Sequence, residues 1–205
     1  MLRVGLTGGL ASGKSFVGSE LERLGCYVIR ADRLGHEALA QGGEAYSAVI
    51  REFGTHLLDE SGAIRRRVLA QEVFDHPERL ALLNDLIHPA VIRREEEMID
   101  AAARRDPDGI SVVEAAILIE TGRYKRFDRM IVVFCSEELQ VRRAMERDGF
   151  TEKEARSRLS RQMPLEEKRA YADYLIDTSG SEESTLLRTQ EVYRALLSIP
   201  RGITL

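Results

Sequence analysis

The residues most suited to chemistry form one short motif near the N-terminus. Gly8-Gly9-Leu10-Ala11-Ser12-Gly13-Lys14-Ser15 fits the pattern G-x-x-x-x-G-K-[ST] of a phosphate-binding loop. Glycines let backbone N–H groups converge on phosphate oxygens, and the following helix directs its positive end at the same anion. Lys14 would bridge the β- and γ-phosphates, and the Ser15 hydroxyl would ligate Mg²⁺. The alternative is an ordinary glycine-rich turn between a strand and a helix. The residues expected to contact ATP are Gly8, Gly9, Ala11, Ser12, Gly13, Lys14, Ser15 and Phe16.

Three carboxylates stand at the ends of apolar runs. Asp32 follows one such run, and a carboxylate near the phosphates can orient or deprotonate an attacking hydroxyl. The alternative is that Asp32 caps the next helix, where aspartate is favoured. Glu114 and Glu120 flank the apolar segment 115–119. Either would contact Mg²⁺ through water or simply mark a solvated strand end.

A basic segment lies between Arg142 and Arg161, with six arginines and one lysine against four acids. Arginines such as Arg143 neutralise the charge on a transferring phosphoryl group, so this segment has the composition of a phosphate-closing lid. The alternative is a solvated helix with salt bridges. His88 precedes Pro89. A histidine at this position is either a residue at a helix end, which is the more common case, or a functional residue.

Composition excludes several classes of protein. The 205 residues are 43% hydrophobic and 31% charged, as in an ordinary globular protein, and their net charge of −4 predicts no nucleic-acid partner. Cys26 and Cys135 are far apart, which favours a reducing compartment. The N-terminus lacks the pattern of a signal peptide, and the longest strongly apolar run, 130–135, is far short of the roughly 20 residues of a membrane span. We therefore expect a cytoplasmic protein without a membrane partner.

Short apolar runs alternate with helical patterns along the chain. The runs at 2–7, 27–31, 110–115, 130–135 and 174–177 predict five strands, and the helices between them predict a parallel sheet covered on both faces. Residues 14–24 follow a helical period, and Gly25 suits the left-handed position after a helix. This is the pattern of an α/β fold.

Two longer segments interrupt the alternation. Residues 32–106 are helical in pattern; Pro77 suits the first turn of one helix, and Pro89 predicts a break at His88 before another helix at 90–105. In residues 137–163, Thr151 and Glu154 have the spacing of a capping box. The expected domains are thus a nucleotide-binding core (1–31, 107–136 and 164–205), a helical acceptor domain (32–106) and a lid (137–163).

Several separated segments together resemble one family, the dephospho-coenzyme A kinases, over nearly the whole chain. The segments that carry the resemblance are 5–15, 29–32, Phe53-Gly54, 62–66 with Leu69, Leu83-Asn84, His88-Pro89, 117–120, Gln140 with Arg143 and Arg147, and Gln162. The phosphate loop alone identifies only a nucleotide-binding superfamily. The ordered set is much more specific.

The resemblance implies transfer of the ATP γ-phosphoryl group to the ribose 3′-hydroxyl of dephospho-coenzyme A, the last step of coenzyme A synthesis. It implies a P-loop core, a helical acceptor domain, a two-helix lid and a requirement for Mg²⁺, with ATP and dephospho-coenzyme A as the bound partners of a monomer or weak homo-oligomer. Implied catalytic residues are Asp32, Lys14 and Arg143; Arg143 and Arg147 would bind ATP, Ser15 the metal, and Asp32, Arg66, His88 and Leu118 the acceptor.

The chain departs from the family pattern at Ala11, Phe16, Arg30, Ala116 and Thr178. The family often has asparagine facing the nucleotide base where Thr178 stands. Two other functions fit the phosphate loop: a nucleoside or nucleotide kinase, and a nucleotide-dependent switch. The helical insertion carrying Arg66 and His88 argues against the first, and the base-reading elements of GTPase-type switches are not found.

Overall fold

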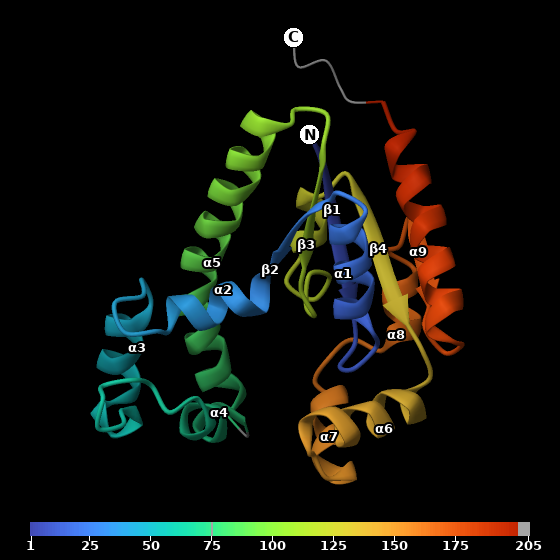
Figure 1. Cartoon of the computed structure of the whole chain (residues 1–205). Coiled ribbons are helices and arrows are strands. Elements are labelled where there is room, and N and C mark those ends of the chain that lie inside the picture. The colour runs from blue at the N-terminus through green and yellow to red at the C-terminus, as the bar shows by residue number, and fades with distance from the viewer. Residues whose placement is uncertain (75, 201–205) are drawn as a thin grey trace. The chain divides into compact units, whose positions relative to one another are not determined.

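The structure, a computed structural model, describes residues 1–74 and 76–200 (Figure 1). The chain divides into two compact units. One comprises Met1–Ile29 and Ala101–Leu205, and the other is Arg30–Asp100. Because each unit has its own core, each is described separately.

The first unit is built on a five-stranded sheet in the order β2-β3-β1-β4-β5. The strands are β1 (Leu2–Gly8), β2 (Tyr27–Arg30), β3 (Ile110–Glu114), β4 (Arg129–Phe134) and β5 (Tyr174–Asp177). β1 pairs in parallel with β3 and β4, and β4 pairs in parallel with β5. All predicted strands are confirmed, with every boundary within one residue. The chain has the predicted α/β fold.

Helices of the first unit follow the strands. They are α1 (Lys14–Arg23), α6 (Glu137–Asp148), α7 (Glu152–Leu159), α8 (Leu165–Arg169) and α9 (Glu182–Leu197), with a short 3₁₀ turn η2 (Arg123–Arg126). Thr151 and Glu154 form the predicted capping box at the start of α7. Beyond the end of α1, Gly25 adopts φ +105°, as its predicted left-handed position requires.

The core of this unit lies between one face of the sheet and the helices α1 and α9, which run side by side (Figure 1). Val17 and Leu21 of α1 recur at helical spacing and are fully buried against the strands. Each such side chain contributes about 1.5–3 kcal/mol through removal of apolar surface from water. This packing fixes α1 on the sheet, and with it the loop that joins β1 to α1.

The second unit is helical. It contains α2 (Ala31–Ala38), α3 (Tyr46–Phe53), a 3₁₀ turn η1 (Thr55–Leu57), α4 (Arg66–Phe74) and most of α5 (Pro77–Arg105). Val49, Phe53 and Leu57 are buried in its separate core, together with Leu69 and Leu83. The helical content expected of residues 32–106 is confirmed.

The predicted break at His88 is wrong, as is the separate helix at 90–105. Pro89 lies inside α5, which continues through it. A proline in a helix removes its own hydrogen bond and disfavours helix in the residue before it, and these are preferences that packing can outweigh. Leu83, Ala90 and Val91 are buried around this point, so the helix is held by its apolar face.

In the part of the chain that the structure describes, no helix is both long enough and apolar enough to cross a membrane.

Candidate active site

The phosphate loop joins the end of β1 at Gly8 to the start of α1 at Lys14. Gly13 adopts φ +90° at the helix N-terminus, and its carbonyl accepts hydrogen bonds from the N–H groups of Phe16 and Val17 at 3.1 and 3.2 Å. A Cβ atom on Gly13 would lie 3.1 Å from the Thr178 methyl group. Because the dihedral angle strains a side chain and a Cβ atom would crowd Thr178, glycine is favoured where the loop turns into the helix.

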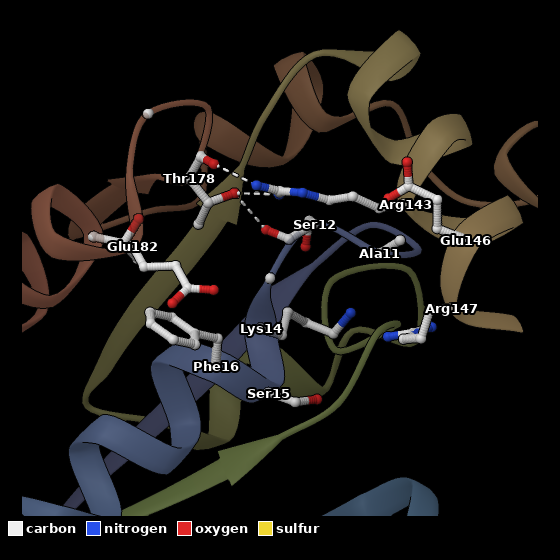
Figure 2. Close-up of a pocket in the computed structure, with 13 residues that line it drawn as sticks. Ala11, Ser12, Lys14, Ser15, Phe16, Arg143, Glu146, Arg147, Thr178 and Glu182 are labelled. Carbon is white, nitrogen blue, oxygen red and sulfur yellow. Dashed lines mark hydrogen bonds between the residues drawn. The ribbon is translucent and has the colours of Figure 1, made fainter.

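The loop forms one wall of a cavity of about 520 Å³ (Figure 2). Other walls come from α6, from the segment after β5 and from the start of α9. The lining residues are Ala11, Ser12, Gly13, Lys14, Ser15, Phe16, Arg143, Glu146, Arg147, Thr178, Gly180, Glu182 and Thr185. Thus the structure brings the predicted residues 11–16 together with Arg143 and Arg147. Gly8 and Gly9 belong to the same loop and do not line the cavity.

Lys14 donates a hydrogen bond from Nζ to the Gly9 carbonyl at 2.9 Å, so its ammonium group reaches back over the loop. The adjacent Ser15 hydroxyl donates to Glu114 Oε1 at 2.6 Å. Glu114 is only 7% exposed, and the interpretation of this residue as a solvated strand end is therefore wrong. It ends β3, the neighbour of β1, which explains why a carboxylate so distant in sequence meets Ser15.

Arg143 of α6 is held by Thr178 (Figure 2). Its guanidinium group donates from Nη1 to the Thr178 hydroxyl at 3.0 Å and from Nη2 to the Thr178 carbonyl at 2.7 Å. The Thr178 hydroxyl in turn donates to the Ser12 carbonyl at 2.8 Å. Arg143 is therefore positioned on the phosphate loop through a single threonine, so it is not a solvated helix residue.

Cys135 lies beside this arginine, which donates weakly to its sulfur at 3.8 Å. Burial raises the pKa of the Cys135 thiol, and Arg143 and Thr178 oppose that shift. The thiol therefore stays protonated at neutral pH, as expected of a packing residue rather than a nucleophile.

Arg147 lines the cavity one turn further along α6. Its guanidinium group makes two hydrogen bonds of 2.8 Å to the Asp148 carboxylate. The hydrogen bonds to Arg147 lower the pKa of Asp148, and those to Asp148 raise the pKa of Arg147. Arg156 of α7 differs from both cavity arginines, because it forms exposed ion pairs with Glu137 and Glu152.

Both ends of the α6–α7 segment bind the backbone of Leu10, in the middle of the phosphate loop. Gln140 Nε2 donates to the Leu10 carbonyl at 2.6 Å, and the Leu10 N–H donates to Gln162 Oε1 at 2.9 Å. Ala144 and Ala155 pack with Ala11 in a small apolar cluster at the same place. Neither the type nor the spacing of Gln140 and Gln162 predicts this contact. Their membership of the family motif was the only indication.

The remaining predicted residues lie elsewhere. Asp32, Arg66 and His88 all belong to the second unit. Asp32 is exposed in the first turn of α2, whose N-cap is Arg30, so the interpretation of Asp32 as the cap is wrong. Leu118 belongs to the first unit and is 1% exposed. No cluster of three or more histidine, cysteine or acidic side chains that could hold a metal occurs within residues 1–74 and 76–200.

A glycine-rich loop between a parallel strand and a helix, with a lysine and a serine at its end and arginines facing it, defines a P-loop kinase. The family model described as dephospho-CoA kinase matches residues 2–184, and the chain belongs to that family. The dephospho-CoA kinase of Aquifex aeolicus (strain VF5) is 40% identical over 200 residues, covering 98% of this chain and all of the relative.

Solved structures share the fold of this chain. A Thermus thermophilus protein superposes with a TM-score of 0.81 at 32% identity, covering 97% of this chain and 98% of its own. The dephospho-CoA kinase from Campylobacter jejuni, at 24% identity and a TM-score of 0.63, covers 95% of this chain and 96% of its own. This last similarity shows the fold alone.

Proposed function

We propose that this protein transfers the γ-phosphoryl group of ATP to the ribose 3′-hydroxyl of dephospho-coenzyme A, giving coenzyme A and ADP. Membership of the dephospho-CoA kinase family supports the acceptor. The observation that carries the proposal is the phosphate loop itself, with Lys14 and Ser15 at its end and Arg143 fixed on it by Thr178.

Lys14, Arg143 and Arg147 bind the triphosphate in this proposal. N–H groups of the loop, such as those of Gly13 and Ser15, would hold its oxygens, because the loop lies at the positive end of α1. During transfer, charge spreads over the γ-phosphoryl oxygens, and cations already in place stabilise it without reorganisation. Arg143 suits this role because Thr178 fixes its guanidinium group.

Ser15 and Glu114 are the residues that would hold Mg²⁺. They offer a hydroxyl and a carboxylate, hard oxygen donors of the kind that Mg²⁺ prefers, and the two groups are in contact. Mg²⁺ usually takes few protein ligands beside phosphate and water, which this small donor set matches. When bound, the ion neutralises charge between the β- and γ-phosphates. Glu114 also holds the Ser15 hydroxyl in place at the start of α1.

Asp32 is the proposed base. Its carboxylate is exposed in the first turn of α2. An ionised carboxylate can orient the acceptor hydroxyl and accept its proton late in transfer. Arg66 and His88 of the same unit would bind the acceptor, together with Leu118.

The protein is proposed to act in the cytoplasm as a monomer or weak homo-oligomer. Both of its cysteines, Cys26 and Cys135, are buried as thiols, which fits a reducing compartment.

The decisive test is product detection. Purified protein is incubated with ATP, Mg²⁺ and dephospho-coenzyme A, and the mixture is analysed by mass spectrometry. Coenzyme A is expected, with one ADP formed for each. A parallel screen of nucleosides and nucleotides as acceptors tests the alternative: faster turnover of one of these, with no coenzyme A formed, would show a different small-molecule kinase.

A further inference from the structure

Lys168 is a fully buried lysine on the short helix α8, with 0% of its side chain exposed. Its Nζ atom donates to the Ala116 carbonyl at 2.7 Å and lies 2.8 Å from Glu120 Oε1. Lysine is almost never fully buried unless it is paired. Lys168 is not among the residues proposed to bind phosphate, metal or acceptor. Those roles therefore do not explain why its ammonium group is buried.

The two partners of Lys168 connect it to the ends of functional segments. The Ala116 carbonyl also accepts a hydrogen bond from the Thr7 hydroxyl at 3.2 Å, next to the phosphate loop. Glu120 Oε1 also accepts the N–H of Met163 at 3.1 Å, just where the chain leaves the α6–α7 segment. One ammonium group therefore links β1, the loop after β3 and the exit of the proposed lid.

The helix that carries Lys168 also approaches the phosphate loop. A Cβ atom on Gly9 would lie 3.5 Å from Leu165 Cγ, the first residue of α8. One residue before Met163, Gln162 binds the Leu10 N–H. A shift of Met163 relative to the loop after β3 would therefore be transmitted directly to the backbone that is proposed to hold the phosphates.

Stability is a weak explanation for such a pair. Removing the Lys168 charge from water offsets most of its attraction to Glu120, and an apolar side chain of similar volume is often as good or better. The Lys168–Glu120 pair is distinguished by what it joins. Its two hydrogen-bonded partners fix the start of the loop after β3 and the end of the lid at a single point.

We propose that Lys168 is a positioning residue for phosphoryl transfer, which holds the lid exit at Met163 against the loop after β3 so that water is kept from the γ-phosphoryl group. The inference rests on the proposed function, since it concerns whether the γ-phosphoryl group is transferred to the acceptor or to water. In the competing reaction, water attacks the γ-phosphorus, the bond to the bridging oxygen of ADP breaks, and inorganic phosphate and a proton are released. A loosened lid exit admits that water.

The test measures ADP and coenzyme A in the same sample, for the wild type and for the double variant Lys168→Met with Glu120→Gln. The double variant removes both charges, keeps an oxygen to accept the Met163 N–H, and leaves no unpaired buried charge. We expect the ratio of ADP to coenzyme A to rise about twofold or more above the wild-type value as water competes for the phosphoryl group. An inactive fraction lowers both products equally, so loss of folded protein does not change the ratio.

Lys153→Met is the matched control, because Lys153 is an exposed lysine on α7. Its ratio is expected to equal that of the wild type. If the double variant also has the wild-type ratio, Lys168 serves packing alone and the inference is overturned. If the wild type itself releases ADP without forming coenzyme A, the proposed function fails, and that outcome is distinct.

Should the double variant not fold, Glu120→Gln alone decides. The Glu120 side chain is 21% exposed, and the amide keeps its shape and an oxygen that can still accept from the Lys168 ammonium group, so this variant is expected to fold. It weakens the link between Lys168 and Met163, and a ratio about 1.5-fold or more above wild type is expected. An unchanged ratio in this variant overturns the inference.

Discussion

Asp32 presents its carboxylate from the first turn of α2, and Arg30 occupies the N-cap position. A substitution at Asp32 therefore tests its proposed role as a base without removing the helix cap. Asp32→Asn keeps the size of the side chain and removes its charge and most of its basicity. Coenzyme A formation is expected to fall about a hundredfold or more, the range usual for acid–base groups, while ATP affinity changes little. Steady-state turnover and equilibrium ATP binding check this.

The same substitution has a small effect on stability. Loss of a carboxylate near a helix N-terminus costs about 0.3–1 kcal/mol. The melting temperature should therefore fall by only about 1–4 °C. Glu37→Gln is the control, because Glu37 lies on the same helix and pairs with exposed Arg33. Wild-type turnover in Asp32→Asn would remove Asp32 as the base.

Arg143 is the second residue whose chemistry can be tested directly. Lysine keeps the positive charge and loses the planar fork that makes two hydrogen bonds to Thr178. Turnover of Arg143→Lys is expected to fall about tenfold or more, since a preorganised contact to the phosphates is lost. Arg156→Lys should retain wild-type turnover, because exposed ion pairs such as those of Arg156 contribute only about 0–1 kcal/mol. Equal losses at both positions would show that only the general charge of the α6–α7 segment matters.

Local spacing was sufficient to predict the phosphate loop, because Gly13, Lys14 and Ser15 act within one turn of chain. The partners that position them were harder to foresee. Thr178 binds Arg143 and Ser12, and Glu114 binds Ser15. These partners are far apart in the sequence, and they meet only because of the order of the strands in the sheet. The sequence placed Glu114 at a strand end and could not show that it is buried.

At the scale of elements, the α6–α7 segment is tied to the phosphate loop through Leu10. Gln162→Ala removes the acceptor of the Leu10 N–H and costs about 1 kcal/mol of stability. Because the loop then has one anchor fewer, its conformation is less defined before ATP binds. We expect KM for ATP to rise about threefold to tenfold, the loss in ground-state binding that 0.7–1.4 kcal/mol of preorganisation represents. Steady-state kinetics at saturating acceptor measure it.

Gln190→Ala is the control for this change. Gln190 on α9 donates to Glu20 at 3.1 Å, so its loss removes a comparable hydrogen bond outside the cavity. It should lower stability by a similar amount without changing KM for ATP. If Gln162→Ala also leaves KM unchanged, Gln162 holds the α6–α7 segment in place without shaping the loop.

The elements themselves show where sequence patterns suffice. Strands that are buried on both faces read as continuous apolar runs, and their ends were predicted within one residue. The continuation of α5 through Pro89 was not predicted, because it depends on packing against residues of other helices in the unit. Lys168 was missed for the same reason. No local sequence pattern predicts that a lysine in a polar segment is buried.

At the scale of the whole molecule, the phosphate loop belongs to the unit formed by Met1–Ile29 and Ala101–Leu205, and the proposed base belongs to Arg30–Asp100. In the proposed function, nucleotide binding and acceptor chemistry would thus be carried by units with separate cores. A ligand stabilises the structure that binds it in proportion to ln(1 + [L]/Kd), and this linkage makes the division measurable.

ATP with Mg²⁺ at about a hundred times Kd should stabilise the protein by about 2.7 kcal/mol. For a chain of this length, the melting temperature should rise by about 5–11 °C. EDTA is expected to reduce the shift, because Ser15 and Glu114 then contribute nothing through a metal. Lys14→Ala should abolish most of it, while leaving the melting temperature of the ligand-free protein near that of the wild type.

Amide hydrogen exchange shows which residues are stabilised by ATP. Protection on adding ATP should be concentrated in residues 1–29 and 101–200, where the cavity lies, with little in residues 30–100. Lys153→Ala serves as the control for Lys14→Ala, since it removes an exposed lysine remote from the loop in sequence and should keep the full ATP shift. A full thermal shift in Lys14→Ala would place ATP elsewhere. Protection confined to residues 30–100 would assign the nucleotide to the helical unit and contradict the site built on the phosphate loop.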